Sequence, residues 1–165
     1  MSPKCDNCGK GAMKVTRENY QYKESGLPNV VLVGVEVRRC PECGTTELAL
    51  PRVAELHRVI ASMVIHKPAR LSGLEVRYLR KFLGWSGADF AEHMGVAPGT
   101  VSNWENDRDT IGTASDRALR LMVAHGSPVQ DYGLDELKKI GADLAPPMAV
   151  RVSKRAGGWG AEASA

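Results

Sequence analysis

The sequence predicts an α+β fold, in which a small antiparallel sheet domain precedes a connecting helix and an all-α domain of four to five helices. All four cysteines of the 165-residue chain lie before position 44, and stretches rich in Val, Tyr and Thr separate them. After Pro51 the apolar residues recur with the period of a helix. We expect a sheet domain over 1–50, a connecting helix over 51–68, a helical domain over 69–126 and a C-terminal extension over 127–165.

The composition is that of a globular protein, with 43% apolar and 25% charged residues. No window approaches the roughly 18 apolar residues that a membrane span needs, and no leader peptide pattern is present. We therefore expect a cytoplasmic protein that has no membrane partner. The net charge of +3 is small, and the segment 69–126 carries as many acidic as basic residues. Any affinity for nucleic acid must come from individually placed contacts.

The cysteines form two C-x2-C pairs, in CDNCGK and RRCPECGT. Two residues between thiols let both sulfurs face one point, so two such turns supply a zinc tetrahedron. Disulfides or free structural thiols are the alternative, but a reducing cytosol disfavours stable disulfides. Gly9 and Gly44 each follow the second cysteine of a pair, where such turns usually need a residue with positive φ. We expect one structural Zn²⁺ and no enzymatic role, since four thiolates leave no position for a catalytic water. The expected ligands are Cys5, Cys8, Cys40 and Cys43.

Between the cysteine pairs, AMKVTRENYQYK and NVVLVGVEVRRC alternate partially and are separated by the turn signal ESGLPN. We expect a small antiparallel sheet with both cysteine turns at one end. A domain of about fifty residues is marginal on its core alone, whereas a structural zinc contributes roughly 10 to 16 kcal/mol in small zinc-finger peptides. The histidines have no ligand spacing to a cysteine and are expected in surface or cap positions.

The segment PRVAELHRVIASMVIH carries a wide apolar stripe and ends before Pro68. Its partner is the sheet domain, the helical domain or a second copy of the chain, and the sequence does not decide between them. Further on, SGLE and SGAD each offer a capping box, and a glycine ends each of these two helices. A third helix begins at Pro98 and runs to about Asn106, and a fourth runs from TASD to Gly126.

The second and third of these helices are separated by a tight turn at GV, which forces them to cross steeply. That is the helix-turn-helix unit, whose second helix can enter a major groove. RKFLGWSGADFAEHMGVAPGTVSNWENDRD, residues 80–109, resembles the Xre (Cro/C1-type) helix-turn-helix, including the W-E-N that closes the recognition helix. With the cysteine pairs in front, the order of parts over residues 3–126 resembles the MqsA/YgiT-type zinc-finger antitoxins.

This resemblance implies a homodimer that binds an operator palindrome in double-stranded DNA and represses transcription, commonly of its own operon. It also implies a zinc domain that binds a toxin, so an alternative is an antitoxin whose zinc domain chiefly neutralises a ribonuclease toxin or another protein. A third alternative, which fewer residues support, is a zinc-ribbon protein that binds RNA. The resemblance further implies a buried ion pair between Arg80 and Glu105, which we assign to the scaffold.

The sequence departs from the family pattern at three places. Gly87 stands where a glutamine often touches phosphate, so only its backbone N–H can make that contact. Ala97 replaces the usual Ser or Thr N-cap, at a cost of about 1 kcal/mol. MqsA-like antitoxins carry an Asn and an Arg that read bases where this chain has Gly99 and Asn103. Gly99 therefore has no side chain with which to read a base, and Asn103 has a shorter side chain than the arginine.

Asn103 is the leading candidate for reading a base, because its amide can pair with adenine N6 and N7, a contact worth about 1 to 3 kcal/mol. Thr100 can add a hydroxyl contact or pack its methyl group against a thymine. The alternative for each polar residue is a solvated side chain on the outer face of the helix. The expected DNA-facing residues are Asn103, Thr100, Ser102, Gly99, Asn106, Arg108 and Gly87.

The C-terminal extension is expected to be partly disordered. Residues 150–153 either add a short strand to a sheet or belong to a disordered end, and disorder is the favoured interpretation. Trp159, isolated in a glycine-rich tail, is the residue there that suggests docking.

Overall fold

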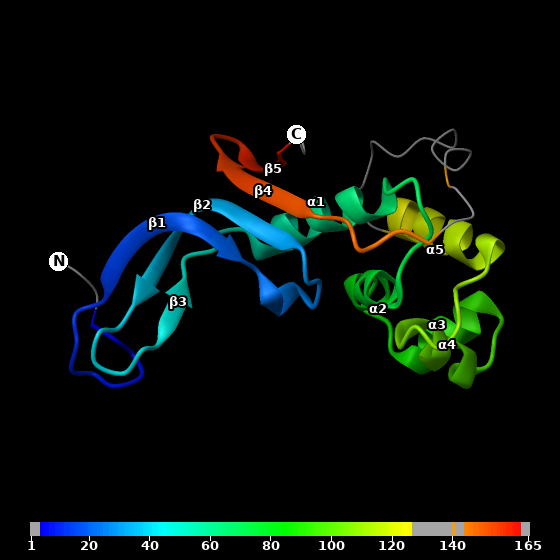
Figure 1. The fold of residues 1–165 in the computed structure, drawn as a ribbon, viewed down its shortest axis with the longest axis horizontal. Helices are drawn as coiled ribbons and strands as arrows, with labels where there is room; N and C mark the ends of the chain where they lie inside the picture. Colours follow the sequence, from blue (N-terminus) through cyan, green and yellow to red (C-terminus); the bar gives the residue numbers. More distant parts are fainter. Residues whose placement is uncertain (1–3, 127–139, 141–143, 163–165) are drawn as a thin grey trace.

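The structure, a computed structural model, describes residues 4–126, 140 and 144–162. Figure 1 shows the strands on one side and helices α2 to α5 on the other, with α1 running between them along the sheet. The predicted α+β class is confirmed. The strands are β1 (Lys14–Gln21), β2 (Val30–Arg39), β3 (Thr46–Leu48), β4 (Val150–Arg155) and β5 (Gly158–Ala161), and η1 (Lys23–Ser25) is a short 3-10 turn. The helices are α1 (Val53–Ile65), α2 (Gly73–Phe82), α3 (Gly87–Met94), α4 (Pro98–Glu105) and α5 (Thr113–Gly126).

The sheet has the order β1-β2-β4-β5, and β3 pairs with the end of β2, from Val37 to Arg39. β1, β3 and β5 pair antiparallel with their neighbours, but β4 lies parallel to β2, from Val30 opposite Val150 to Val33 opposite Ser153. Within residues 1–50 the sheet is antiparallel as expected, and the added strand β4 makes the whole sheet mixed. It also draws two strands from outside residues 1–50.

The favoured expectation of disorder fails for residues 150–161, which form β4 and β5. Val150 and Val152 alternate with polar residues and are fully buried, so β4 covers an edge of β2 and adds to its apolar face. Trp159 docks as its isolation suggested, since its indole N–H donates to the Pro51 carbonyl at 2.8 Å. The rest of the extension, apart from residues 140, 144–149 and 162, lies outside the described residues.

An irregularity in β2 keeps its apolar side chains on one face. Gly34 has a φ of 62°, and its N–H is bound by the Asn19 side chain. The pairing with β1 shifts register at this point, so the residues on both sides of the irregularity turn the same way. The buried β2 side chains are Val30, Leu32, Val35 and Val37.

The apolar stripe of α1 packs on both halves of the molecule. Leu56, Ile60 and Val64 are buried in one core that also includes β2, β4 and the helices α2 to α5. Of the three partners left open by the sequence, the sheet and the helical half are thus both contacted. Among the described residues, the main core runs without a break from the sheet of residues 14–39 into the helical half.

A buried polar network joins the end of α1 to α5 and to the segment before β4. Arg120 pairs with Asp116 at 2.6 Å and donates to the carbonyl of Ile65 at 2.7 Å. Lys67 pairs with Glu75 at 2.9 Å, and Glu75 also accepts a bond from the Met148 N–H. Breaking one member of such a buried pair is costly, because the other charge is left without its partner. The network therefore fixes how the two halves meet.

Candidate metal centre and nucleic-acid interface

The two cysteine turns have the same local geometry. The N–H of Gly9 donates to the Cys5 carbonyl at 2.9 Å, and the N–H of Gly44 donates to the Cys40 carbonyl at 3.0 Å. Both glycines have positive φ, 66° and 72°, which favours glycine at these positions. Each C-x2-C pair is thereby closed into a tight turn, and the second cysteine of each can point back beside the first.

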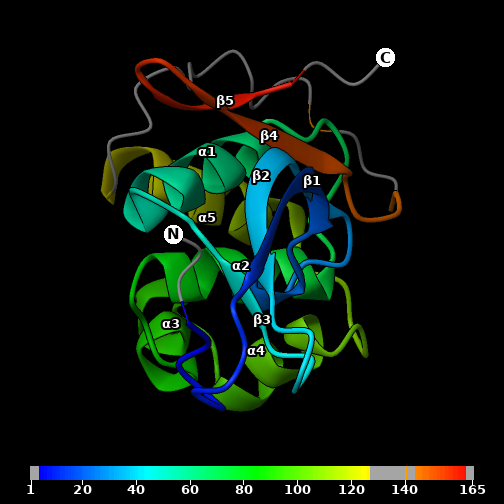
Figure 2. The same cartoon turned by 90° about the vertical axis from the view of Figure 1, so that its left-hand side faces the viewer.

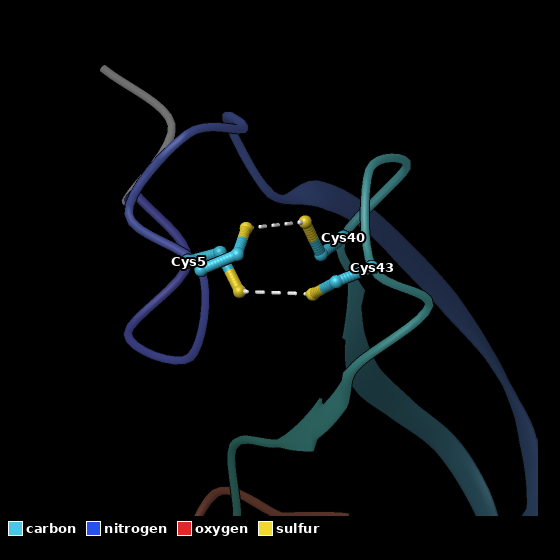
Figure 3. A group of neighbouring side chains, drawn as sticks. Cys5, Cys40 and Cys43 are labelled. Carbon is cyan, nitrogen blue, oxygen red and sulfur yellow. Dashed lines mark hydrogen bonds between the residues drawn. The ribbon is translucent and has the colours of Figure 1, made fainter.

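The four sulfurs meet at one point between the turns, and Figure 3 shows the two knuckles facing each other. The Sγ atoms of Cys5 and Cys43 lie 3.7 Å apart, those of Cys8 and Cys40 lie 3.6 Å apart, and all four lie within 4.8 Å of one another. A zinc ion with Zn–S bonds of about 2.3 Å in a tetrahedron places its sulfurs about 3.8 Å apart. Disulfides would need about 2.05 Å. The spacing fits a metal ion bound by four thiolates and does not fit disulfides.

Hydrogen bonds at Cys8 and Cys43 favour the thiolate, the form that binds metal, whereas at Cys40 the backbone hydrogen bond of Cys43 is outweighed by burial and the neighbouring thiols, which raise the pKa to about 11. The side chain and backbone N–H of Thr45 lower the pKa of Cys43 to about 6. Backbone N–H groups of Lys10 and Gly11 also lower the pKa of Cys8. The Asn7 amide links the two knuckles, because it donates to the Thr45 hydroxyl at 3.0 Å. Sequence reasoning did not single out Asn7 or Thr45, although both lie beside the cysteine turns.

Helices α3 and α4 form the expected helix-turn-helix, at the bottom of Figures 1 and 2 and away from β4 and β5. Ser86 and Asp89 make the capping box that begins α3, and Gly95 ends it with a φ of 64°. Val101 and Trp104 turn the inner side of α4 into the core. The opposite side of α4 is left at the surface.

The outer side of α4 carries most of the residues expected to face DNA. Asn103 is exposed, and its side-chain amide makes no hydrogen bond within the described part of the chain. Its donor and acceptor are therefore both free for a base edge. Thr100 is half-buried at the first turn of the helix. The other exposed candidates on or just after α4 are Gly99, Ser102, Asn106 and Arg108.

Asn106 differs from Asn103 because its amide is used at both ends. Its Nδ2 donates to the Ser102 carbonyl at 2.7 Å, and its Oδ1 accepts from Arg77 Nη2 at 2.9 Å. Reading DNA with Asn106 would cost these two bonds. Asn103 is thus better prepared for a base, and Asn106 is better suited to ending the helix.

Arg80 and Glu105 form the ion pair that the family resemblance implied. Arg80 Nε and Nη2 donate to the two oxygens of Glu105 at 2.5 and 3.1 Å, a bidentate geometry. Arg77 adds a third bond to Glu105 at 3.1 Å, which sequence reasoning missed. Burial alone would raise the pKa of Glu105, but the hydrogen bonds and charges of Arg80 and Arg77 outweigh it and hold that pKa below its usual range. The cluster fastens α4 to α2.

Asp107, which follows α4, turns back toward α2. Its backbone has a φ of 52°, and its Oδ1 accepts a bond from the Gly73 N–H at 2.7 Å. Position 73 must be a glycine, because a Cβ there would come within 2.4 Å of the Trp104 carbonyl oxygen. Asp107 therefore caps the first turn of α2 and anchors the end of the recognition helix.

The N-terminus of α3 is closed by the Ser86–Asp89 capping box, whereas the N-terminus of α4 has no side-chain cap. Gly87, the first residue of α3, is half-buried, and a Cβ there would meet nothing within 4 Å. At α4 the N-cap Ala97 supplies no side-chain bond, and Pro98 has no N–H to offer. The N–H groups at these helix starts are the ones that phosphates commonly bind.

Comparison with known proteins identifies one part of the chain. Residues 76–115 match a protein-family model described as a helix-turn-helix (HTH_3), of the Xre type, and this match runs from α2 into α5. Families of this kind are DNA-binding regulators and are generally not enzymes. No curated protein matches the chain. Within the described residues, every helix is too short or too polar to cross a bilayer.

Proposed function

We propose that this protein is a sequence-specific DNA-binding regulator of transcription, acting as a repressor, with a structural zinc ion in its four-cysteine centre. The free amide of Asn103, on the exposed side of a helix held in place by the Glu105 cluster, is the observation that carries the proposal. A reader on such a fixed helix loses little freedom on binding, so its hydrogen bonds count toward discrimination.

On DNA, α4 lies in the major groove with Asn103 and Thr100 toward the base edges. The backbone N–H of Gly87 and the N-terminus of α4 bind phosphates on either side, with Ser102 and Arg108 as further phosphate contacts. Gly99 has no side chain to hold the backbone away from the DNA. These contacts replace the strong positive field that this segment lacks.

One amide reader gives little discrimination by itself, about 1 to 3 kcal/mol for a good bidentate pair. Specific sites generally need about 4 to 10 kcal/mol over random DNA. Two copies on a palindrome double the number of readers, so we propose a homodimer on an operator whose half-sites lie about 34 to 36 Å apart, or a multiple of that.

An antitoxin role is the second candidate, and an open strand favours it. β1 pairs on one side with β2, no described strand pairs with its other side, and Val15 in β1 is 44% exposed. An unpaired edge of this length is a template for a partner's strand. Co-expression with a ribonuclease encoded beside this gene tests the role. Recovery of a stable complex that relieves toxicity supports it, and free toxin with unrelieved toxicity contradicts it.

DNase footprinting upstream of the protein's own gene tests the regulator. We expect a palindromic protected region, and Asn103→Ala should weaken binding there by roughly 1 to 3 kcal/mol and relax one base position in each half-site. Thr46→Ala, an exposed change on β3, is the matched control and should bind as the wild type does. Equal affinity and selectivity of Asn103→Ala would remove Asn103 from the interface.

A further inference from the structure

A cleft lies where the sheet half meets the helical half. It has a volume of about 510 Å³ and is bordered by the turn after β1, by α1 and by α2. In Figure 1 that turn points from the sheet toward α2. Clefts of this size, between elements from different parts of a fold, are typical places for small-molecule sites. The lining residues used below are Gly26, Ala54, His57, Arg58, Tyr78, Lys81 and Phe82.

One wall of the cleft is formed by His57 and Tyr78, which hydrogen bonds hold in place. His57 lies between two tyrosines, with its Nε2 3.2 Å from the Tyr22 hydroxyl and its Nδ1 3.1 Å from the Tyr78 hydroxyl. The Tyr78 hydroxyl also donates to the His57 carbonyl at 3.1 Å. With its polar atoms engaged in this way, the cluster presents a preformed wall, and the half-buried Phe82 adds an apolar surface beside it.

The mouth of the cleft is positively charged. Arg58 from α1 and Lys81 from α2 are both exposed, and neither makes an ion pair in the described ranges 4–126, 140 and 144–162. Glu24 is the one acidic residue of the lining, and its carboxylate is engaged by the Tyr20 hydroxyl at 2.9 Å. Two cations on separate helices that line the same cleft create an attractive potential for an anion.

We propose that this cleft binds a small organic anion, a carboxylate or a phosphate monoester carried on a compact apolar group. Arg58 and Lys81 hold the charged end, and Phe82 and Tyr78 pack against the apolar part. Arg supplies a flat donor fork for such groups, and Lys supplies a compact point charge. The site does not depend on the proposed DNA binding, since none of its residues belongs to the recognition helix.

The position of the cleft gives such a ligand a route to α4. A molecule there contacts α2, the same helix whose Arg77 and Arg80 hold Glu105 of α4. It also contacts the turn of the sheet half at Gly26. Occupation of the cleft therefore acts on the junction that orients the recognition helix.

Calorimetric titration of the metal-loaded, full-length protein tests the site with benzoate and phenyl phosphate, and benzyl alcohol serves as the uncharged control. We expect saturable binding of at least one of the two anions and none of benzyl alcohol at the same concentrations. Arg58→Gln and Lys81→Gln should each weaken that binding about tenfold, as the loss of a charged hydrogen bond does. Arg117→Gln, an exposed change on α5, should leave it unchanged. Absence of binding by both anions, or equal losses with Arg117→Gln, overturns the proposal.

A second pair of measurements locates the bound anion. Ala54→Trp fills the cleft from its exposed rim without altering charge, and it should abolish binding while the circular dichroism spectrum is retained. Amide shifts on titration should centre on Gly26, Ala54 and Phe82. Undiminished binding by Ala54→Trp overturns the assignment. So do shifts centred on a second cavity, of about 710 Å³, whose lining includes Arg17, Lys154 and Trp159. Failure of DNA binding in the footprint, with anion binding intact, would count against the regulator alone.

Discussion

The knuckle end and the body of the sheet belong to the same strands but are stabilised in different ways. At the knuckles, the buried side chains are Cys5, Cys40 and Met13, and they form a small cluster separate from the main core. The body of the sheet, around Val30 and Leu32, shares one continuous core with α1 and with the helical half. Hydrophobic packing holds one end of β2, and we expect a metal ion bound by the four cysteines to hold the other.

This difference limits what the metal stabilises. The sequence suggested that residues 1–50 would depend on zinc as a unit. The structure instead gives β2 a parallel partner in β4 and a covering helix in α1, neither of which touches the metal centre. We expect the metal-dependent part to be confined to the two cysteine turns and the strand ends beside them.

The largest effect is expected from Cys40→Ser, which removes one of four thiolates from a site worth roughly 10 kcal/mol or more in metal binding. Metal content should fall from one ion per chain to none. Amides of the two cysteine turns should lose protection in hydrogen exchange, while those of β2 at Val30–Val33 and of α1 should keep it. Asp6→Ser, an exposed change in the Cys5–Cys8 turn, is the control. Loss of protection throughout β2 would show that the whole strand, and not only the end beside the cysteine turns, depends on the metal.

Trp159→Ala should have the converse effect, because this side chain closes the core over α1 and bonds the Pro51 carbonyl. Removing a buried tryptophan costs about 3 to 5 kcal/mol. Thermal or denaturant unfolding should show the loss, with one metal ion still bound in the folded protein. Lys154→Ala, an exposed neighbour in β4, should change stability little. A large fall in metal content alongside the stability loss would mean that the two ends are coupled.

Glu105→Gln should destabilise the helical half by about 2 to 4 kcal/mol, since it leaves Arg80 without its charged partner. The same pair makes stability depend on pH. Because the folded pKa of Glu105 is depressed, its contribution is present above the unfolded pKa of about 4.3 and is lost as the pH falls through the folded pKa. Denaturant unfolding at pH 7 and at pH 3 should show the difference between wild type and variant shrinking at low pH. Glu92→Gln, exposed on α3, should show little effect at either pH.

Asn7→Ala should have the smallest effect, and it should be confined to the knuckles. Its amide bridges the two turns through Thr45, so its loss should weaken metal binding about tenfold, as changes beside metal ligands commonly do. Competition with a chelator measures the affinity. An unfolding free energy of the metal-free protein that matches wild type would place the effect at the metal, and a lowered one would contradict that.

Much of the fold could be predicted because its signals are local. The cysteine turns, the capping boxes at Ser72 and Ser86 and the N1 proline at Pro98 each depend on a few neighbouring residues, and all are observed. The position of β4 depends on a pairing across more than a hundred residues, which no local pattern encodes. A glycine-rich tail therefore suggested disorder, although the alternation of Val150 and Val152 was the available signal.

The candidate site divides in the same way. Helical spacing is enough to place Asn103 on the outer side of α4 and Trp104 on the inner side. Spacing could not show that Arg77 would donate hydrogen bonds to both Glu105 and Asn106, or that Asp107 would turn back to cap α2. Those contacts depend on how two helices cross, and that is set by packing rather than by period.

The most direct test of the account is a thermodynamic cycle between Asn103 and the base pair that it contacts. Affinities of wild type and Asn103→Ala are measured on the footprinted operator and on operators altered at one base pair at a time. We predict that the loss of about 1 to 3 kcal/mol from Asn103→Ala disappears on an operator altered at one particular position. An equal loss on every operator, and on random DNA, would show that Asn103 reads no base and would contradict the assignment of α4 as the reading helix.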